Sequence, residues 1–391
     1  MMPKSMRFNI LISFVTISGF TQGMLLPLLA ILLEDMGVSS SVNGLHATGL
    51  YIGVLIASPF MEKPLHRFGY KPMIVTGGAL VFVSLLLFPL FPSLLIWFIL
   101  RLGVGVGDHM LNFATQTWIT SATPQYKRGK IIAIYGLFFS LGFALGPLML
   151  KLVKVHPHLP FFLASFFCFV AWLFVLFIQN DHVEQDETIQ TVQIQSTFAR
   201  FGLTIKLAWL SLLGPFAYGI LEAVLHGIFP VYGMRIGYSV DTIAYIIPLF
   251  SIATLFTQVP LGTISDRIGR KKMLAIVTSA GTIIFLIGAL FEQHFFVIIL
   301  TFVVAGGLLG SLFSMGVSFM TDSLPKQLLP AGNIMCGISF SLGSMIGPYF
   351  GGAAIQQFPQ VSLFYSLAVM LFVIALLFIF FTPKRVQAET T

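Results

Sequence analysis

The sequence is poor in charge and in cysteine. Only 9% of its 391 residues are Asp, Glu, Lys or Arg, whereas soluble domains carry about 25%, and this excludes a water-soluble enzyme. Cys168 and Cys336 both lie in apolar segments and give neither a disulfide framework nor a metal-ligand spacing. Neither a phosphate-binding Gly-x-x-x-x-Gly-Lys-Ser/Thr loop nor a Gly-rich serine elbow occurs, so we expect no enzymatic or ATP-driven activity, no cofactor and no metal.

The sequence is rich in long runs of apolar residues. Apolar residues make up 57% of the chain, 41 residues are Phe, and the mean hydropathy is +0.95. A bilayer core about 30 Å thick needs roughly 20 apolar residues per helix, and runs of that length predict an all-α integral membrane protein with twelve spans. The runs are Phe8–Leu33, Met36–Met61, Met73–Leu100 (one span and the start of the next), Gly103–Trp118, Ile131–Leu150, Phe161–Ile178, Leu207–Phe229, Thr242–Ser265, Met273–Phe291, Phe295–Thr321 and Gln327–Pro383 (two spans divided near Pro359).

The net charge of +7 is a signal of topology. Twelve spans place both termini on one side, and nearly all of the 21 Lys and Arg residues then fall in loops on that side. The exceptions are Lys151, Lys154 and Arg235 outside and Arg101 within a span. The positive-inside rule therefore predicts cytoplasmic termini and a multi-pass protein of the cell membrane, and no nucleic-acid partner is expected.

One long hydrophilic segment, Gln179–Arg200, separates the sixth predicted span from the seventh. It divides the chain into an N-terminal six-helix bundle at 1–179, a cytoplasmic linker at 180–204 and a C-terminal six-helix bundle at 205–391. The halves repeat each other at an offset of about 200 residues, which superimposes Arg67–Lys71 on Arg267–Lys271. Two parallel six-helix halves are typical of a secondary transporter with a substrate site near mid-membrane.

The loop after the eighth predicted span carries a motif of glycine and charged residues. Its residues are Gly262, Asp266, Arg267, Gly269, Arg270 and Lys271. Gly permits close helix approach, and the Asp and Arg side chains can pair with neighbouring helix ends and hold one conformation; the simpler interpretation is plain topogenic charge. The loop resembles that of the major facilitator superfamily, and the resemblance covers nearly the whole chain. The first-half copy has Glu62 in place of the Gly and His66 in place of the Asp, so an identical latch is not expected there.

Two further motifs narrow this resemblance. Arg101 opens an Arg-x-x-x-Gly-x-Gly segment, and the fifth and eleventh spans each contain Gly-x-x-x-Gly-Pro. The latter residues are Gly142, Gly146 and Pro147, and Gly343, Gly347 and Pro348. The pattern is similar to that of the twelve-helix drug:proton antiporters of bacteria, the tetracycline and multidrug efflux group. Small residues four apart let helices pack closely, and Pro introduces a bend that can act as a hinge; ordinary small-residue packing is the alternative.

Ionisable side chains within spans are costly and are therefore functional candidates. Arg101, Asp108 and Asn112 lie on one stripe of the fourth span. We predict that Asp108 exchanges protons and that Arg101 is its electrostatic partner or an anion contact, with Asn112 in the substrate cavity. A static ion pair between Arg101 and Asp108 is the alternative, and neighbouring His109 is predicted to be a packing histidine.

The seventh span aligns Tyr218, Glu222 and His226 at steps of four residues. Glu222 with His226 is a second candidate for proton coupling or a site for a cationic group, and Tyr218 is expected in the cavity. A hydrogen-bonded tie between helices is the structural alternative. Gln22 and Gln258 are candidate hydrogen-bond donors to substrate, or ties between helices.

These features predict a proton-coupled efflux antiporter for small amphipathic or hydrophobic compounds, working by alternating access. Its expected partners are the lipid bilayer, a small-molecule substrate and protons, and we expect a functional monomer. One alternative is a lipid or glycolipid flippase, since Lys151 and Lys154 resemble a basic segment of glycolipid-flipping relatives. A second alternative is a sugar or metabolite exporter, which would need more polar side chains in its cavity than the sequence places there. A membrane receptor or scaffold is a different class, and it has no reason to keep polar stripes on the fourth and seventh spans together with both repeat motifs.

Overall fold

The structure is a computed structural model that describes residues 4–123, 128–182, 197–325 and 328–381. Over these residues it contains only α-helices and short 3-10 helices, connected by turns and bends. Most of the predicted linker, residues 183–196, lies outside the described residues, as do residues 382–391. The all-helical architecture confirms the predicted fold class.

The chain forms two compact units. The first comprises Met1–Val38, Leu45–Gln185 and Gly237–Pro248; the second comprises Ser39–Gly44, Asp186–Ile236 and Leu249–Thr391. The first turns of α2 therefore group with the second unit, and those of α10 group with the first.

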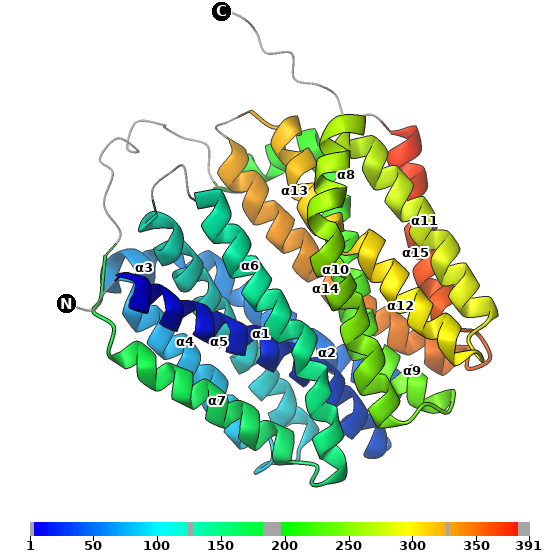
Figure 1. The fold of residues 1–391 in the computed structure, drawn as a ribbon, viewed down its shortest axis with the longest axis horizontal. Helices are drawn as coiled ribbons and strands as arrows, with labels where there is room; N and C mark the ends of the chain where they lie inside the picture. The colour runs from blue at the N-terminus through cyan, green and yellow to red at the C-terminus, as the bar shows by residue number, and fades with distance from the viewer. Residues whose placement is uncertain (1–3, 124–127, 183–196, 326–327, 382–391) are drawn as a thin grey trace, which may run out of the picture. The chain divides into compact units, whose positions relative to one another are not determined.

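Helices of the first repeat follow one another in the order of the predicted spans (Figure 1). They are α1 (Lys4–Asp35), α2 (Ser40–Ala57), η1 (Ser58–Phe60), α3 (Glu62–Phe68), α4 (Tyr70–Leu87), α5 (Leu94–Ser121), α6 (Arg128–Leu145), η3 (Gly146–Lys154) and α7 (Leu159–Leu176). Within the first unit, α1 packs along α6, and α4 packs along both α5 and α7.

The second repeat follows the same order. It consists of α8 (Thr197–Gly227), α9 (Phe229–Arg235), α10 (Val240–Ile268), α11 (Arg270–Leu290), α12 (Phe295–Leu309), α13 (Leu312–Ser323), α14 (Leu329–Gln357) and α15 (Leu363–Phe380). Here α8 packs along α14 and α13, and α11 packs along α15 and α12. These pairs match those of the first unit, as the sequence repeat predicts.

Eleven helices of the described residues are long and apolar enough to cross a membrane. The twelfth predicted span, Met36–Met61, corresponds to α2, an 18-residue helix that is not among the eleven. Its first half contains Ser40, Asn43 and His46, and these polar residues reduce its mean hydropathy. Large apolar side chains elsewhere are exposed, such as Phe256 and Phe380 at 75%, as expected where lipid covers the protein.

The Gly-x-x-x-Gly elements lie where helices approach most closely. A Cβ atom at Gly142 would stand 1.9 Å from the Thr16 carbonyl oxygen on α1, and one at Gly343 would stand 2.1 Å from that of Phe216 on α8. Both copies therefore pack a small-residue face against the first helix of their own repeat, which is the packing role that the sequence left open beside the hinge.

The following Gly-Pro pairs differ in conformation. At Gly146-Pro147 the α-helix ends and a 3-10 segment begins, whereas α14 runs through Gly347 and Pro348 to Gln357. The helix therefore changes from α to 3-10 at the Gly-Pro pair of the first repeat and stays α-helical at that of the second repeat.

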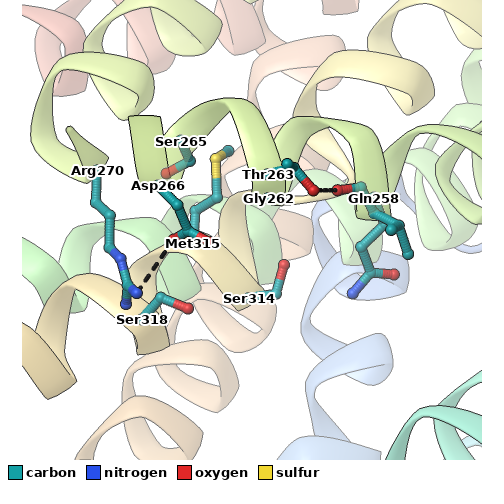
Figure 2. Close-up of a pocket in the computed structure, with 10 residues that line it drawn as sticks. Gln258, Gly262, Thr263, Ser265, Asp266, Arg270, Ser314, Met315 and Ser318 are labelled. Atoms are coloured by element: carbon teal, nitrogen blue, oxygen red, sulfur yellow. Dashed lines mark hydrogen bonds and ion pairs between the residues drawn. The ribbon is translucent and has the colours of Figure 1, made fainter. Parts of the chain in front are cut away.

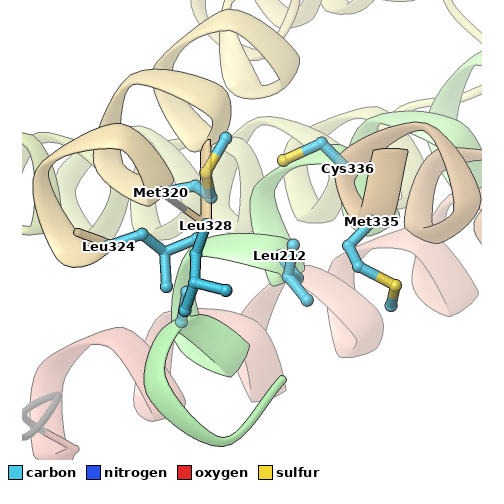
Figure 3. Packing of buried hydrophobic residues seen from close by; sticks show 7 residues of the cluster. Leu212, Met320, Leu324, Leu328, Met335 and Cys336 are labelled. Atoms are coloured by element: carbon cyan, nitrogen blue, oxygen red, sulfur yellow. The ribbon is translucent and has the colours of Figure 1, made fainter. Parts of the chain in front are cut away.

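Buried apolar side chains pack between the helices of the second unit. One cluster joins α8, α13 and α14 through Leu212, Met320, Leu324, Met335 and Cys336 (Figure 3). It lies beside Ala208, where α8 is kinked (φ −125°, ψ 17°). Cys168 and Cys336 are both free and buried.

Candidate functional site

Asp108 lies at the centre of a buried polar cluster in the first unit. Its side chain is on α5 and the residue is only 4% exposed. The Ser18 hydroxyl and the Gln22 amide on α1 both donate hydrogen bonds to its carboxylate, and the Asn112 amide donates a third at 3.1 Å. The spacing of four residues in each helix places both pairs of side chains on facing surfaces.

A third helix completes this cluster. The Tyr135 hydroxyl of α6 donates to the Asn112 side-chain oxygen at 2.7 Å, and the Asn112 amide also donates to the Ser18 hydroxyl at 2.9 Å. Asp108, Asn112 and Gln22 were predicted as site residues, and the structure brings them together. Ser18 and Tyr135 were missed, although Ser18 stands one turn before Gln22 and so shares its face.

Protonation of Asp108 would change the hydrogen bonding of this cluster. An ionised carboxylate only accepts hydrogen bonds, whereas a carboxylic acid donates one. Three donors from two helices converge on Asp108, so protonation would set its new O–H against a donor and require that donor to turn. A change of charge at Asp108 would therefore alter hydrogen bonds that join α1 to α5.

Arg101 lies apart from this cluster. It is 1% exposed, and its Nη1 and Nη2 atoms find no hydrogen-bond acceptor among the described residues. Seven residues separate it from Asp108, roughly 10 Å of axial rise, and no ion pair joins these two described side chains. Arg101 and Asp108 share a stripe of α5, but the hydrogen-bond donors to Asp108 come from α1 and not from Arg101.

Two histidines of the first unit have structural contacts. His109 places Nε2 3.1 Å from the Ser58 hydroxyl and stacks on Phe113, in agreement with the predicted packing role. His46 on α2 places Nε2 3.1 Å from the Leu94 carbonyl oxygen.

In the second unit, Tyr218, Glu222 and His226 follow one another along α8. Tyr218 and Glu222 stand one helical turn apart and so share a face of α8. His226 is fully buried, and its Nδ1 atom lies 2.9 Å from the backbone carbonyl oxygen of Glu222. The predicted alignment is present, and this histidine contact is made to the helix backbone.

Aromatic rings surround Tyr218. Its ring centroid lies 6.0 Å from that of Phe340 on α14, in a stacked arrangement, and 6.5 Å from that of Phe313 on α13. The two Phe rings meet edge to face at 5.7 Å. The Glu222 carboxyl thus lies one turn from a tyrosine that packs against two Phe rings. No sequence signal distinguished Phe313 and Phe340 among the 41 Phe residues.

A polar cavity of about 300 Å³ in the second unit unites residues that were predicted for two different roles (Figure 2). Gln258, Gly262 and Asp266 line it from α10, and Ser314 and Ser318 line it from α13. Steps of four residues align the first three on one face of α10. The predicted substrate contact Gln258 therefore opens into the same space as the loop motif.

Arg270 closes one end of this cavity. Its Nη2 atom lies 3.2 Å from an Asp266 carboxylate oxygen (Figure 2). Its Nε atom lies 3.1 Å from a carboxylate oxygen of Asp322 on α13. Arg267 is exposed, and Gly269 forms the turn before α11 with φ +95°. The motif therefore ties the end of α10 to the start of α11 and the end of α13.

The basic pair of η3 has partners within the first unit. Lys154 forms an ion pair with Asp241, and the Lys151 ammonium lies 3.5 Å from the centroid of the Tyr245 ring. The sequence predicted no partner for Lys151 or for Lys154.

Comparison with known proteins agrees with this architecture. The family model of the Major Facilitator Superfamily matches residues 11–239 and 211–391. The "Uncharacterized MFS-type transporter YfkF" of Bacillus subtilis (strain 168) is 48% identical over 97% of this chain and 96% of its own length. "Multidrug resistance protein 2" of the same organism is 24% identical over 88% of each chain.

A crystal structure of the nucleoside transporter NupG shares the fold. Its TM-score is 0.77 at 13% sequence identity, over 95% of this chain and 98% of that chain. The chain belongs to the Major Facilitator Superfamily, and the protein is a multi-pass membrane transporter.

Proposed function

We propose that the protein is a proton-coupled efflux antiporter for small amphipathic, hydrophobic compounds. The observation that carries the proposal is the Asp108 cluster, in which one buried carboxyl receives three hydrogen bonds from α1 and α5. Because protonation exchanges an acceptor for a donor, it changes how well these helices fit together. A proton that binds better in one conformation shifts the equilibrium between conformations by that difference in affinity.

The substrate class rests on α8 and the helices that pack on it. Glu222 and the rings of Tyr218, Phe313 and Phe340 combine a negative charge with flat apolar surfaces. Positively charged groups are attracted both to a carboxylate and to the faces of aromatic rings. Lipophilic cations are therefore the expected substrates, with Glu222 and His226 as a second proton-coupling site. The similarity to a multidrug resistance protein supports this class.

Transport would proceed by alternating access of the two repeats, with Asp266, Arg270 and Asp322 holding one end of the second unit in one state. The positive-inside rule predicts that this end, together with both chain termini, lies in the cytoplasm of a bacterial cell. The proposed working form is a monomer in the lipid bilayer.

The alternative of a lipid or glycolipid flippase rested on a basic pair that could receive a headgroup. Lys154 is engaged by Asp241 and Lys151 by the Tyr245 ring. These contacts favour a structural role for the pair.

A sugar exporter would need polar groups around its substrate, which the cavity at Gln258 could provide. The aromatic rings around Tyr218, one helical turn from Glu222, support an apolar substrate there instead.

The test is ethidium transport in everted membrane vesicles with and without an imposed pH gradient. Gradient-driven uptake is expected in the wild type, and we expect its loss when nigericin collapses the gradient. The double variant Asp108→Asn, Glu222→Gln should lose gradient-driven uptake. The matched control is Asp35→Asn, which makes the same chemical change at an exposed carboxyl on α1. Unchanged gradient-driven uptake in the double variant would overturn the proton assignment.

A further inference from the structure

The turn between α3 and α4 is covered by the chain that leaves α7. Gly69 forms this turn with φ +82° and ψ −175°, a conformation that essentially only glycine adopts. The first N–H groups of a helix have no acceptor within the helix, and a glycine has no side chain to cap them. The start of α4 therefore needs acceptors from elsewhere.

Asn180 and Asp181 supply these acceptors. The Tyr70 amide donates to the Asp181 carbonyl oxygen at 3.1 Å, and the Lys71 amide donates to the Asn180 side-chain oxygen at 3.0 Å. The Asn180 amide group also donates to the Phe68 carbonyl oxygen at 2.9 Å. Asn180 and Asp181 thus bridge the end of α3 and the start of α4, which lie more than 100 residues before them in the chain.

The contact is close at the glycine itself. A Cβ atom at Gly69 would lie 2.5 Å from the Asp181 carbonyl oxygen and 2.8 Å from the Asn180 side-chain amide atoms. The glycine therefore serves both the turn and the docking of this segment.

The Asp181 carboxylate reaches two further helices. It lies 3.4 Å from Arg7 Nη1 on α1 and accepts from the Trp118 indole N–H of α5 at 3.4 Å. The Arg7 guanidinium carbon lies 5.0 Å from the Trp118 ring centroid. Tyr70 also stacks on Trp118, with ring centroids 5.4 Å apart and planes at 6°. Arg7, Trp118, Tyr70 and Asp181 thus form one group at the ends of α1, α4 and α5.

The equivalent place in the second repeat is built differently. Gly269 also has a positive φ, but a Cβ atom there would meet nothing within 4 Å. The acid of that loop is Asp266, which pairs with Arg270. In the first repeat the corresponding positions hold His66 and Tyr70, and the Tyr70 hydroxyl reaches Ser121 at 3.1 Å where Arg270 reaches Asp322.

We propose that Asn180 and Asp181 are positioning residues of transport, in which Asp181 supplies the carboxylate that the loop motif of the first repeat lacks. Together they cap α4 and hold the ends of α1, α4 and α5 in the observed arrangement. The inter-repeat linker therefore begins with a fixed structural element. This proposal rests on membership of a transporter family and not on the substrate or the coupling ion proposed above.

The docking is tested by hydrogen exchange of the purified full-length protein, read in peptides that contain Tyr70 and Lys71. Asn180→Ala removes one acceptor of α4 and the bond to Phe68, and we expect at least about tenfold faster exchange there, as for loss of about 1.4 kcal/mol. Peptides that contain Arg270 and Lys271 report on the matching turn of the second repeat and should be unchanged. His182→Ala, which alters an exposed neighbouring side chain, is the control. Unchanged exchange at Tyr70 and Lys71 in Asn180→Ala would overturn the docking.

The positioning role is tested by ethidium transport in vesicles that contain equal amounts of folded protein. Asp181→Ala should lower the maximal rate at least about threefold and leave KM unchanged, because Asp181 lies at the helix ends with Arg7 and Trp118. Asp181→Glu, which keeps the charge, should restore more than about half of the rate. A wild-type rate in Asp181→Ala would overturn the positioning role. Absence of transport in the wild type would contradict the proposed substrate class, while the exchange measurement would still decide the docking.

Discussion

The two repeats share their helix order and differ in the chemistry of equivalent places. In the first unit, Asp108 is enclosed by amides and hydroxyls. In the second, Glu222 lies one helical turn from Tyr218, which packs against two Phe rings. Under the proposed function, the first environment would exchange a proton and the second would contact an apolar cation. The two repeats thus share their helix packing and differ in the contacts of their buried carboxyl groups.

The loop motifs show the same divergence. The second repeat satisfies Arg270 with two carboxylates, and the first stacks Tyr70 on Trp118 and takes its carboxylate from Asp181. By contrast, Gly142 and Gly343 make equally close helix contacts in the two repeats. Backbone packing tolerates little change, whereas the ends of helices accept different partners.

The largest effect that separates the two carboxyl sites is expected from Glu222→Gln. Loss of the charge beside the aromatic rings should raise KM for tetraphenylphosphonium about tenfold, that is about 1.4 kcal/mol. KM for a neutral amphipathic compound should change less than about twofold. Concentration-dependent uptake in everted vesicles measures both values. An equal rise of KM for the neutral compound would place Glu222 outside cation recognition and weaken the contrast between the repeats.

A smaller effect is expected from Tyr135→Phe in the first unit. It removes the hydroxyl that donates to the Asn112 side chain, and one such hydrogen bond is worth about 1 kcal/mol. The gradient-driven rate should fall about three- to fivefold, with KM for tetraphenylphosphonium unchanged. Tyr365→Phe, which removes a hydroxyl from α15, serves as the matched control. A change in KM without a change in rate would assign the cluster to substrate binding.

Hydropathy and helical spacing predicted the spans and part of each site. Hydropathy located eleven spans that the structure retains and a twelfth, α2, which Asn43 and His46 make more polar. Helical spacing predicted that Asp108 and Asn112 share a face, and Gln22 was selected as an amide within a span. All three meet in one cluster.

The remaining site residues depend on how helices are rotated against each other. Ser18 and Tyr135 are polar residues of a kind common in apolar helices, and only the packing of α1 and α6 on α5 brings them to Asp108. The shared stripe of Arg101 and Asp108 predicted communication between them, but spacing along one helix does not show which neighbouring helix satisfies each group. Asn180 and Asp181 belong to a hydrophilic segment and had no periodicity to mark them.

The most direct test of the central claim is proton release on substrate binding. Tetraphenylphosphonium is added to the purified protein in weakly buffered detergent solution, and a pH indicator reports the released protons. We expect wild-type protein and the Asp35→Asn control to release protons on binding, and Asp108→Asn to bind the compound and release fewer protons, since only the Glu222 and His226 site remains. Equal release from Asp108→Asn and wild type would contradict the assignment of proton coupling to the first unit.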